Sequence, residues 1–250
     1  MTQFATAEDG VRIAYETAGE GKSIILAHGF ASDRMQNWKN VGWYETLNGA
    51  GFRVVALDFR GHGESDRPHE DRFYGDKMLG DVLAVMDCEE IERADLMGYS
   101  MGAILSVGLL MSNPQRIRGA VLAGIGEKYF DERTVRRRGI ADALRAADPG
   151  TISDPEQRAF RAFASQSGKD IAALAACMSA DRTMCSPAQL GACKIPVLIV
   201  AGELDQQAGS PEPLAAAFAN GRAVSVPGRD HMTAVGDKVY KQAVLDFLRS

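Results

Sequence analysis

The stretch Gly98-Tyr99-Ser100-Met101-Gly102 has the pattern Gly-x-Ser-x-Gly, with apolar runs directly before and after it. This order predicts a short buried strand, a tight turn and a helix, with Ser100 at the apex in a strained backbone conformation. Glycine is needed at Gly98 and Gly102 because a Cβ there would collide where strand and helix approach closely. The turn would lift the Ser100 hydroxyl out of the sheet, which makes Ser100 a candidate nucleophile.

A serine hydroxyl needs a base to take its proton and a carboxylate to orient that base. In a strand–turn–helix arrangement of this kind, the expected chain order is serine, then acid, then histidine. Of the four histidines in the chain, only His231 follows Ser100. It lies just past the apolar strand predicted at 222–226, in a loop from which it could reach the serine. We therefore predict that His231 is the base.

The acid has three candidates in the sequence. Asp205 follows the strongly apolar strand predicted at 196–201, so its carboxylate should lie at the carboxyl edge of the sheet. Glu203, two residues earlier, is the nearest alternative. Asp230 adjoins His231 but would have to fold back on its neighbour. We predict Asp205 as the acid.

Acyl transfer also requires an oxyanion hole, in which backbone amides stabilise the developing negative charge. One donor should be the amide of Met101, the residue after the nucleophile. The second should come from the loop after the early strand at 23–27. Gly29 permits close approach of the backbone there, which points to the amide of Phe30. His28, next to that glycine, is interpreted as a structural residue that holds the loop.

These features together resemble the α/β-hydrolases of the lipase and esterase type. The resemblance rests on His28-Gly29, the segment 58–66, the Gly-x-Ser-x-Gly stretch, and the late Asp205 and His231. It covers nearly the whole chain apart from residues 127–193. It implies that His62, in the Arg-Gly-His-Gly part of segment 58–66, is mainly structural. The serine at the apex separates this chain from family members with an aspartate nucleophile.

Alternating strand and helix patterns predict an α/β fold with a mostly parallel central sheet and helices on both faces. A hairpin at 4–6 and 12–16 adds antiparallel edge strands. Further strands are predicted at 23–27, 53–57, 94–97, 117–123, 196–201 and 222–226. Helices between them are predicted at 38–48, 74–88, 101–113, 214–219 and 235–248.

The alternation stops between residues 127 and 192, where only helices are predicted, at 131–147, 154–165 and 170–178. The family resemblance implies that such an insertion forms a small helical cap over the active site. We therefore divide the chain into a first part of the hydrolase core at 1–126, the cap at 127–192 and a second part of the core at 193–250.

The predicted cap carries a cluster of arginines. The cluster consists of Arg133, Arg136, Arg137 and Arg138. Such a cluster could recognise an anionic substrate. It is also typical of a solvated helix face. We expect the solvated face.

Composition excludes several classes of function. The chain has 250 residues, 46% of them hydrophobic, and a formal net charge of −5, which argues against nucleic-acid binding. No apolar run reaches the length of a membrane span, and the first residues do not resemble a signal peptide. Four cysteines without close-paired spacing suggest neither a zinc site nor a disulfide framework. A cytoplasmic location is the resulting expectation.

The sequence therefore predicts a serine hydrolase that cleaves a small carboxylic ester or a related acyl compound, with no metal or organic cofactor. The predicted partner is a small-molecule acyl substrate; no oligomeric state is predicted. The same triad would also serve a carbon–carbon bond hydrolase or a cofactor-free haloperoxidase or perhydrolase. An alternative of another class is a ligand receptor that keeps the hydrolase fold.

Overall fold

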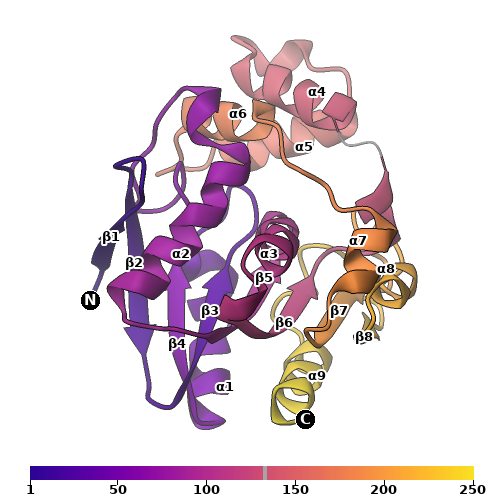
Figure 1. Cartoon of the computed structure of the whole chain (residues 1–250). Coiled ribbons are helices and arrows are strands. Elements are labelled where there is room, and N and C mark those ends of the chain that lie inside the picture. Colours follow the sequence, from indigo (N-terminus) through magenta and orange to yellow (C-terminus); the bar gives the residue numbers. More distant parts are fainter. Residues whose placement is uncertain (132–133) are drawn as a thin grey trace.

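A computed structural model describes residues 1–131 and 134–250. Within these residues, eight strands form one sheet in the order β1-β2-β4-β3-β5-β6-β7-β8 (Figure 1). The strands are β1 (Gln3–Thr6), β2 (Arg12–Ala18), β3 (Lys22–Ala27), β4 (Phe52–Leu57), β5 (Ala94–Tyr99), β6 (Ile117–Ala123), β7 (Val197–Gly202) and β8 (Gly221–Val226).

The sheet is parallel apart from one edge. Strand β2 pairs antiparallel with β1 and with β4, whereas all other neighbouring strands run parallel. Successive side chains of a strand point to opposite faces. In β3, for example, Ile25 packs into the core on one face while Ile24 and Leu26 pack into the core on the other. Strands that are apolar on both sides must be covered on both faces.

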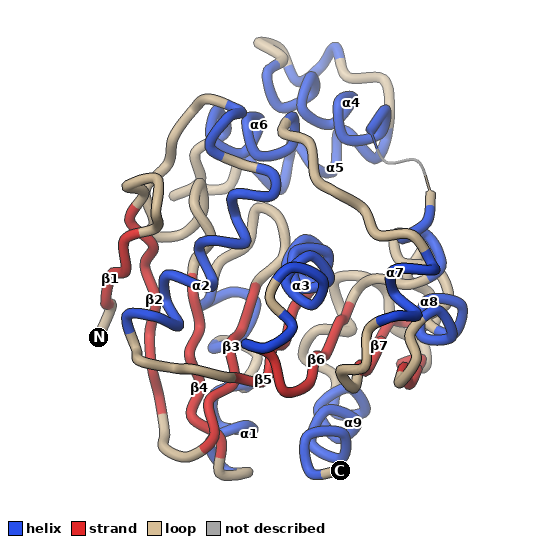
Figure 2. Tube along the Cα trace, viewed as in Figure 1, coloured by secondary structure: helices blue, strands red, loops and turns tan. Residues whose placement is uncertain are grey.

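Helices supply that cover, as Figure 2 shows. Helices α2 (Leu79–Cys88), α3 (Met101–Ser112) and α8 (Glu212–Ala217) pack on one face. Helices α1 (Trp43–Gly49) and α9 (Lys238–Arg249) pack on the other. The predicted fold class, an α/β fold with a mostly parallel sheet between two layers of helices, is confirmed. No helix in the described ranges is long and apolar enough to cross a membrane.

Two predicted helices are interrupted in the structure. The helix predicted at 38–48 is a π-helical turn at Met35–Lys39 followed by α1, because Gly42 between them has a left-handed backbone with φ of 77°. The helix predicted at 74–88 begins as a 3₁₀ turn at Gly75–Met78, and only then continues as α2. In both cases the apolar pattern of the sequence continues through the interruption, so the pattern does not show where the α-helix begins.

Between β6 and β7, in the part that the structure describes, the chain is helical and contains no strand. Helices α4 (Thr134–Arg145), α5 (Pro155–Ala164) and α6 (Ile171–Ser179) gather into a bundle at one end of the sheet (Figure 1). Their own small core includes Ile140, Leu144 and Leu174, and Phe30 from the loop after β3 packs against it. This bundle therefore faces the loops that follow the parallel strands.

A further helix, α7 (Pro187–Ala192), was not predicted and packs against α8 rather than within the bundle. Its signal is present in the sequence. Ser186 accepts a hydrogen bond from the amide of Gln189, and the Gln189 side chain accepts one from the amide of Ser186. This reciprocal pair is a capping box, and Pro187 occupies the first turn.

Candidate active site

Ser100 occupies the turn between β5 and α3. Its backbone has φ of 52° and ψ of −110°, a region that residues with a side chain rarely adopt. The amide of Ser100 donates to the carbonyl of Ala123 at 2.7 Å, and the amide of Ile104 donates to the carbonyl of Ser100 at 3.0 Å. These bonds hold the strained residue between the sheet and the first turn of the helix.

The two glycines around Ser100 have the packing role that the sequence predicts. A Cβ on Gly98 would lie 2.5 Å from the carbonyl oxygen of Gly102. A Cβ on Gly102 would collide with the backbone carbonyl of Ala27 in the neighbouring strand. Both obstacles are backbone atoms, which cannot move aside as a flexible side chain can.

The predicted triad residues lie within hydrogen-bond distance of one another. His231 Nδ1 donates to Asp205 Oδ2 at 2.7 Å, and His231 Nε2 accepts from Ser100 Oγ at 3.1 Å. Asp205 follows β7 and His231 follows β8, so loops at the carboxyl ends of neighbouring strands bring them together. The arrangement can transfer a proton from the serine to the imidazole while the carboxylate orients the ring.

Both carboxylate oxygens of Asp205 accept hydrogen bonds. Its side chain is fully buried. Oδ1 accepts hydrogen bonds from the amides of Gln207 and Ala208, each at 2.9 Å, and Oδ2 faces His231. Hydrogen bonds of this kind offset the cost of burying a carboxylate. The tight loop after β7 supplies them.

The carboxylates of the other two acid candidates, Glu203 and Asp230, accept hydrogen bonds from groups other than the His231 ring. Glu203 Oε2 accepts from the amide of Gly228 at 2.7 Å. Asp230 Oδ1 accepts from the hydroxyl and amide of Thr233, and these hydrogen bonds lower the pKa of Asp230. Both carboxylates thus stabilise the loop that carries His231.

The two candidate oxyanion donors border the space beside Ser100. Met101 is the first residue of α3, and the amides of the first helical turn have no acceptor inside the helix. Within the described residues, the amide of Phe30 has no acceptor either. Both residues line cavities that also include Ser100. Two donors of this kind could stabilise negative charge on a substrate oxygen.

His28 and His62 are buried in the loops beneath the site. His28 Nε2 accepts from the amide of Phe59 at 3.0 Å, while His28 Nδ1 lies 2.7 Å from the carbonyl of Gly29. His62 Nδ1 donates to the carbonyl of Arg60 at 2.9 Å. Burial lowers the pKa of both histidines, so both are held neutral. These contacts are structural, in agreement with the interpretation from the sequence.

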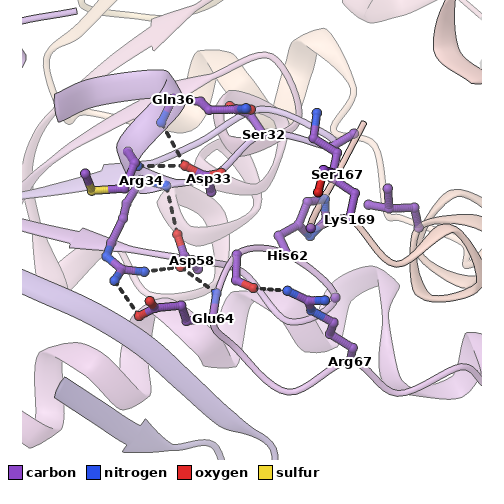
Figure 3. A pocket seen from close by; sticks show the side chains of 16 residues that line it. Ser32, Asp33, Arg34, Gln36, Asp58, His62, Glu64, Arg67, Ser167 and Lys169 are labelled. Carbon is purple, nitrogen blue, oxygen red and sulfur yellow. Dashed lines mark hydrogen bonds and ion pairs between the residues drawn. The ribbon is translucent and has the colours of Figure 1, made fainter. Parts of the chain in front are cut away.

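His62 also borders a polar pocket of about 260 Å³, shown in Figure 3. In this pocket Arg34, which is almost fully buried, forms ion pairs with Asp58 and Glu64. Lys169, contributed by the segment between α5 and α6, lies on the opposite wall, and burial lowers its pKa to about 8. The paired charges of Arg34 connect the loop after β3 with the loop after β4.

Two cavities meet at Ser100. The larger, about 410 Å³, is lined by His231, Met232, Tyr99 and apolar side chains that include Phe163. The smaller, about 100 Å³, lies on the side of Met101. Ser100, Phe30, Phe160 and Gln207 border both cavities, so a substrate could extend from the serine in two directions.

Tyr99 and Gln207, which were not among the predicted site residues, also line the larger cavity at Ser100. The Tyr99 hydroxyl donates to the backbone carbonyl of His231 at 2.7 Å, and the two rings lie 5.6 Å apart. Gln207 lies two residues after the predicted acid Asp205, and this short distance along the chain is the sequence signal for its place at the site. Tyr99 lies inside the Gly-x-Ser-x-Gly stretch itself, but nothing in the pattern distinguishes a packing tyrosine from one that contacts the histidine.

The arginine cluster differs from the solvated face that we expected. Arg133 lies outside the described residues, and Arg138 is exposed, as a solvated face requires. Arg136 and Arg137 are partly buried, however, and both line the smaller cavity beside Ser100. The expectation is therefore wrong for these two residues, because Arg136 bonds to Glu156 of α5 and Arg137 to the carbonyl of Met178 in α6.

No group of three or more His, Cys, Asp or Glu side chains in the described residues is arranged to hold a metal ion.

The family model of the alpha/beta hydrolase fold matches residues 22–145. A hydrolase from Pseudomonas aeruginosa PA01 has a similar structure, with 27% sequence identity, a TM-score of 0.83, and coverage of 100% of this chain and 98% of that chain. The enol-lactonase from Burkholderia xenovorans LB400 is 26% identical with a TM-score of 0.73, covering 99% of this chain and 100% of that chain. The chain belongs to the α/β-hydrolase fold family.

A curated relative is the putative 2-succinyl-6-hydroxy-2,4-cyclohexadiene-1-carboxylate synthase of Bacillus subtilis. It is 31% identical over 149 residues, which are 56% of this chain and 52% of the relative. The alignments with the first curated relatives span between 40% and 62% of the lengths of those relatives. The family relation is thus clear, whereas the reactions named for the relatives differ from one another.

Proposed function

We propose that the protein is a serine hydrolase that cleaves a small carboxylic ester or related acyl compound through an acyl-enzyme. The single observation that carries this proposal is the hydrogen-bonded chain from Ser100 Oγ through His231 to the buried Asp205. The strained backbone of Ser100 supports it, because strain of this kind collects at functional sites.

In the proposed reaction, His231 Nε2 takes the proton of Ser100 as its oxygen attacks the carbonyl carbon of the ester. Asp205 orients the imidazole and stabilises its charged form. The amides of Phe30 and Met101 would hold the oxyanion of the tetrahedral intermediate. His231 then gives its proton to the leaving alcohol, which leaves the acyl group bound to Ser100. Water activated by His231 releases the acid.

We also propose that residues 127–192 contain a cap whose helices α4, α5 and α6 cover the site. In support of this, Phe160 of α5 borders both cavities beside Ser100, and Met178 of α6 borders the smaller one. The rings of Phe160 and Phe30 lie 5.9 Å apart, which joins the bundle to the loop after β3. A cover of this kind would limit the size of the acyl substrate.

A panel of ethyl and 4-nitrophenyl esters of graded acyl length tests this proposal. Wild-type protein should hydrolyse the shorter esters, and Ser100→Ala should lose turnover by on the order of a thousandfold or more. Circular dichroism and thermal unfolding of Ser100→Ala provide the control for folding. Equal ester turnover by wild type and Ser100→Ala would refute the proposed mechanism.

Carbon–carbon bond hydrolysis by the same triad is the second candidate. The positions of Arg136 and Arg137 beside Ser100 favour it over the remaining alternatives, since such substrates are carboxylic acids that a guanidinium can bind. Turnover of a dienol-type acid at a rate above that of every simple ester in the panel would place this candidate first.

A further inference from the structure

The cavity on the Met101 side of Ser100, which we call the arginine cavity, is lined by arginine side chains. Three arginines line it, namely Arg136, Arg137 and Arg182, together with apolar side chains. None of its lining residues in the described chain is an aspartate or a glutamate. A wall of guanidinium groups beside a nucleophile is suited to an anionic group of the substrate.

Two of the three guanidinium groups are positioned by the end of α6. Arg182 Nη2 donates to the carbonyl of Cys177 at 3.2 Å, and Arg137 Nη2 donates to the carbonyl of Met178 at 3.1 Å. Carbonyls at the last turn of a helix lack intrahelical partners, so cations are favourable there. These contacts fix where the two arginines lie.

The charge of Arg136 is compensated by an ion pair with Glu156. Its Nε and Nη2 bind the carboxylate of Glu156, at 3.0 Å and 2.5 Å. Arg182, in contrast, forms no ion pair with any carboxylate among the described residues, and its Nε is buried without a hydrogen-bond partner there. The charge of Arg182 is therefore available to an anionic group of a substrate in the cavity that this arginine lines.

The position of His231 indicates which part of the substrate enters the arginine cavity. The histidine must protonate the leaving alcohol, so the alcohol lies on its side of Ser100. His231 borders the larger cavity and not the arginine cavity. The arginine cavity, next to the candidate oxyanion donor Met101, is therefore on the acyl side.

We propose that the acyl group of the substrate carries a terminal carboxylate, which Arg182 binds in the arginine cavity. The substrate class is thus a half-ester, or a related acyl compound, of a short dicarboxylic acid. This inference rests on the proposed serine hydrolase function and specifies its substrate. The volume of about 100 Å³ suits a carboxylate on a short methylene arm better than a long acyl chain.

The test compares two esters of nearly equal shape. Monoethyl glutarate carries the terminal carboxylate, and ethyl 5-methylhexanoate has an uncharged isopropyl group in its place. We expect kcat/KM for monoethyl glutarate to be at least about tenfold higher, through a lower KM, as expected for a charged hydrogen bond. An equal or higher kcat/KM for the uncharged ester overturns the proposal.

Carboxymethyl 5-methylhexanoate, with its carboxylate on the alcohol, tests the side assignment. It should be no better than the uncharged ester, and a preference for it over monoethyl glutarate overturns the assignment to the acyl group.

The variant Arg182→Met removes the charge at similar length. It should lower the ratio of kcat/KM between monoethyl glutarate and the uncharged ester at least about tenfold. Arg138→Met is the matched control, since Arg138 is exposed on α4 and does not line the arginine cavity, and it should leave the ratio as in wild type. If Arg182 only stabilises the end of α6, Arg182→Met lowers kcat/KM equally for both esters. A ratio of the two kcat/KM values that stays as in wild type therefore overturns the proposal.

A binding measurement separates this inference from the proposed function. If neither ester is hydrolysed by wild type, the proposed function fails, and titration calorimetry with monoethyl glutarate still tests the subsite. Ser100→Ala should bind monoethyl glutarate, and adding Arg182→Met should weaken that binding at least about tenfold. Equal binding by the single and double variants overturns the inference. If wild type hydrolyses both esters with equal kcat/KM, the inference about the terminal carboxylate is overturned, whereas the proposed serine hydrolase function stands.

Discussion

The hydroxyl of Tyr99 donates a hydrogen bond to the backbone carbonyl of His231, across 132 residues of chain, at 2.7 Å. The neighbouring residue Ser100 is the partner of the His231 side chain. Two adjacent residues of β5 and its turn therefore contact the same histidine, one through its backbone and one through its ring. This relationship connects the placement of the proposed base to the strand that carries the proposed nucleophile.

Tyr99→Phe should lower kcat by about tenfold with little change in KM, because a small displacement of the base impairs proton transfer. Steady-state kinetics with a short ester measures the two parameters separately. Tyr240→Phe is a matched control, since the buried hydroxyl of Tyr240 has no hydrogen-bond partner among the described residues. Its kcat should stay near that of wild type. A Tyr99→Phe enzyme with wild-type kcat would show that the contact does not position His231.

The identity of the acid can be tested with two isosteric variants. Asp205→Asn should lower kcat by roughly a thousandfold or more, because the amide leaves the imidazole in the wrong tautomer. Glu203→Gln should cost far less, since Glu203 contacts the amide of Gly228 instead. Kinetics on one ester at a single pH provides both values. The reverse order of effects would assign the acid to Glu203.

Two glycines of α3 should respond differently to alanine. Gly102→Ala should lower the free energy of unfolding by roughly 2 kcal/mol or more, because the new Cβ would collide with the backbone of Ala27. Gly108→Ala should cost much less, since its Cβ would meet only the side chain of Leu79, and alanine favours the helix. Urea unfolding of both variants measures this difference. Equal losses would mean that the close approach of α3 to β3 is not required.

Acid should destabilise the fold through His62. Burial, and next the nearby His28, lower the pKa of His62 well below 6.5, so the unfolded chain binds a proton that the folded chain does not. The stability that depends on neutral His62 is therefore present above about pH 6.5 and is lost as the pH falls below it. Burial raises the pKa of Asp81 to about 6, which acts in the opposite direction, so a difference between variants is needed.

Urea unfolding of wild type and His62→Asn between pH 7.5 and 5 supplies that difference. The free energy of unfolding of His62→Asn should change with pH less steeply, by about 1 kcal/mol per pH unit below pH 6.5. If the free energy of unfolding changes equally with pH in the two proteins, His62 is protonated in the folded state.

Much of the fold was predictable because strand and helix patterns alternate with few interruptions. The predicted strand at 117–123 has the bounds of β6, since its ends coincide with turns that are visible in the sequence. The break at Gly42 was not predictable, because a glycine inside an apolar helical pattern does not reveal its own backbone angle. The capping box of Ser186 and Gln189 is a sequence signal for the start of α7.

The candidate site was predictable to the extent that it follows chain order. Ser100 and His231 are related by order along the chain, and Asp205 by its position after a buried strand. The contacts of Arg182 could not be predicted, because they depend on where the last turn of α6 lies relative to the loop that follows it. The partial burial of Arg136 likewise depends on the packing of α4 against the rest of the chain.

The most direct test of the central claim, that Ser100 is the nucleophile, is covalent labelling with a fluorophosphonate followed by peptide mass spectrometry. The account predicts one label per chain, attached to Ser100, and no label on a folded Ser100→Ala variant. A label on any other serine, or undiminished labelling of Ser100→Ala, would contradict the account.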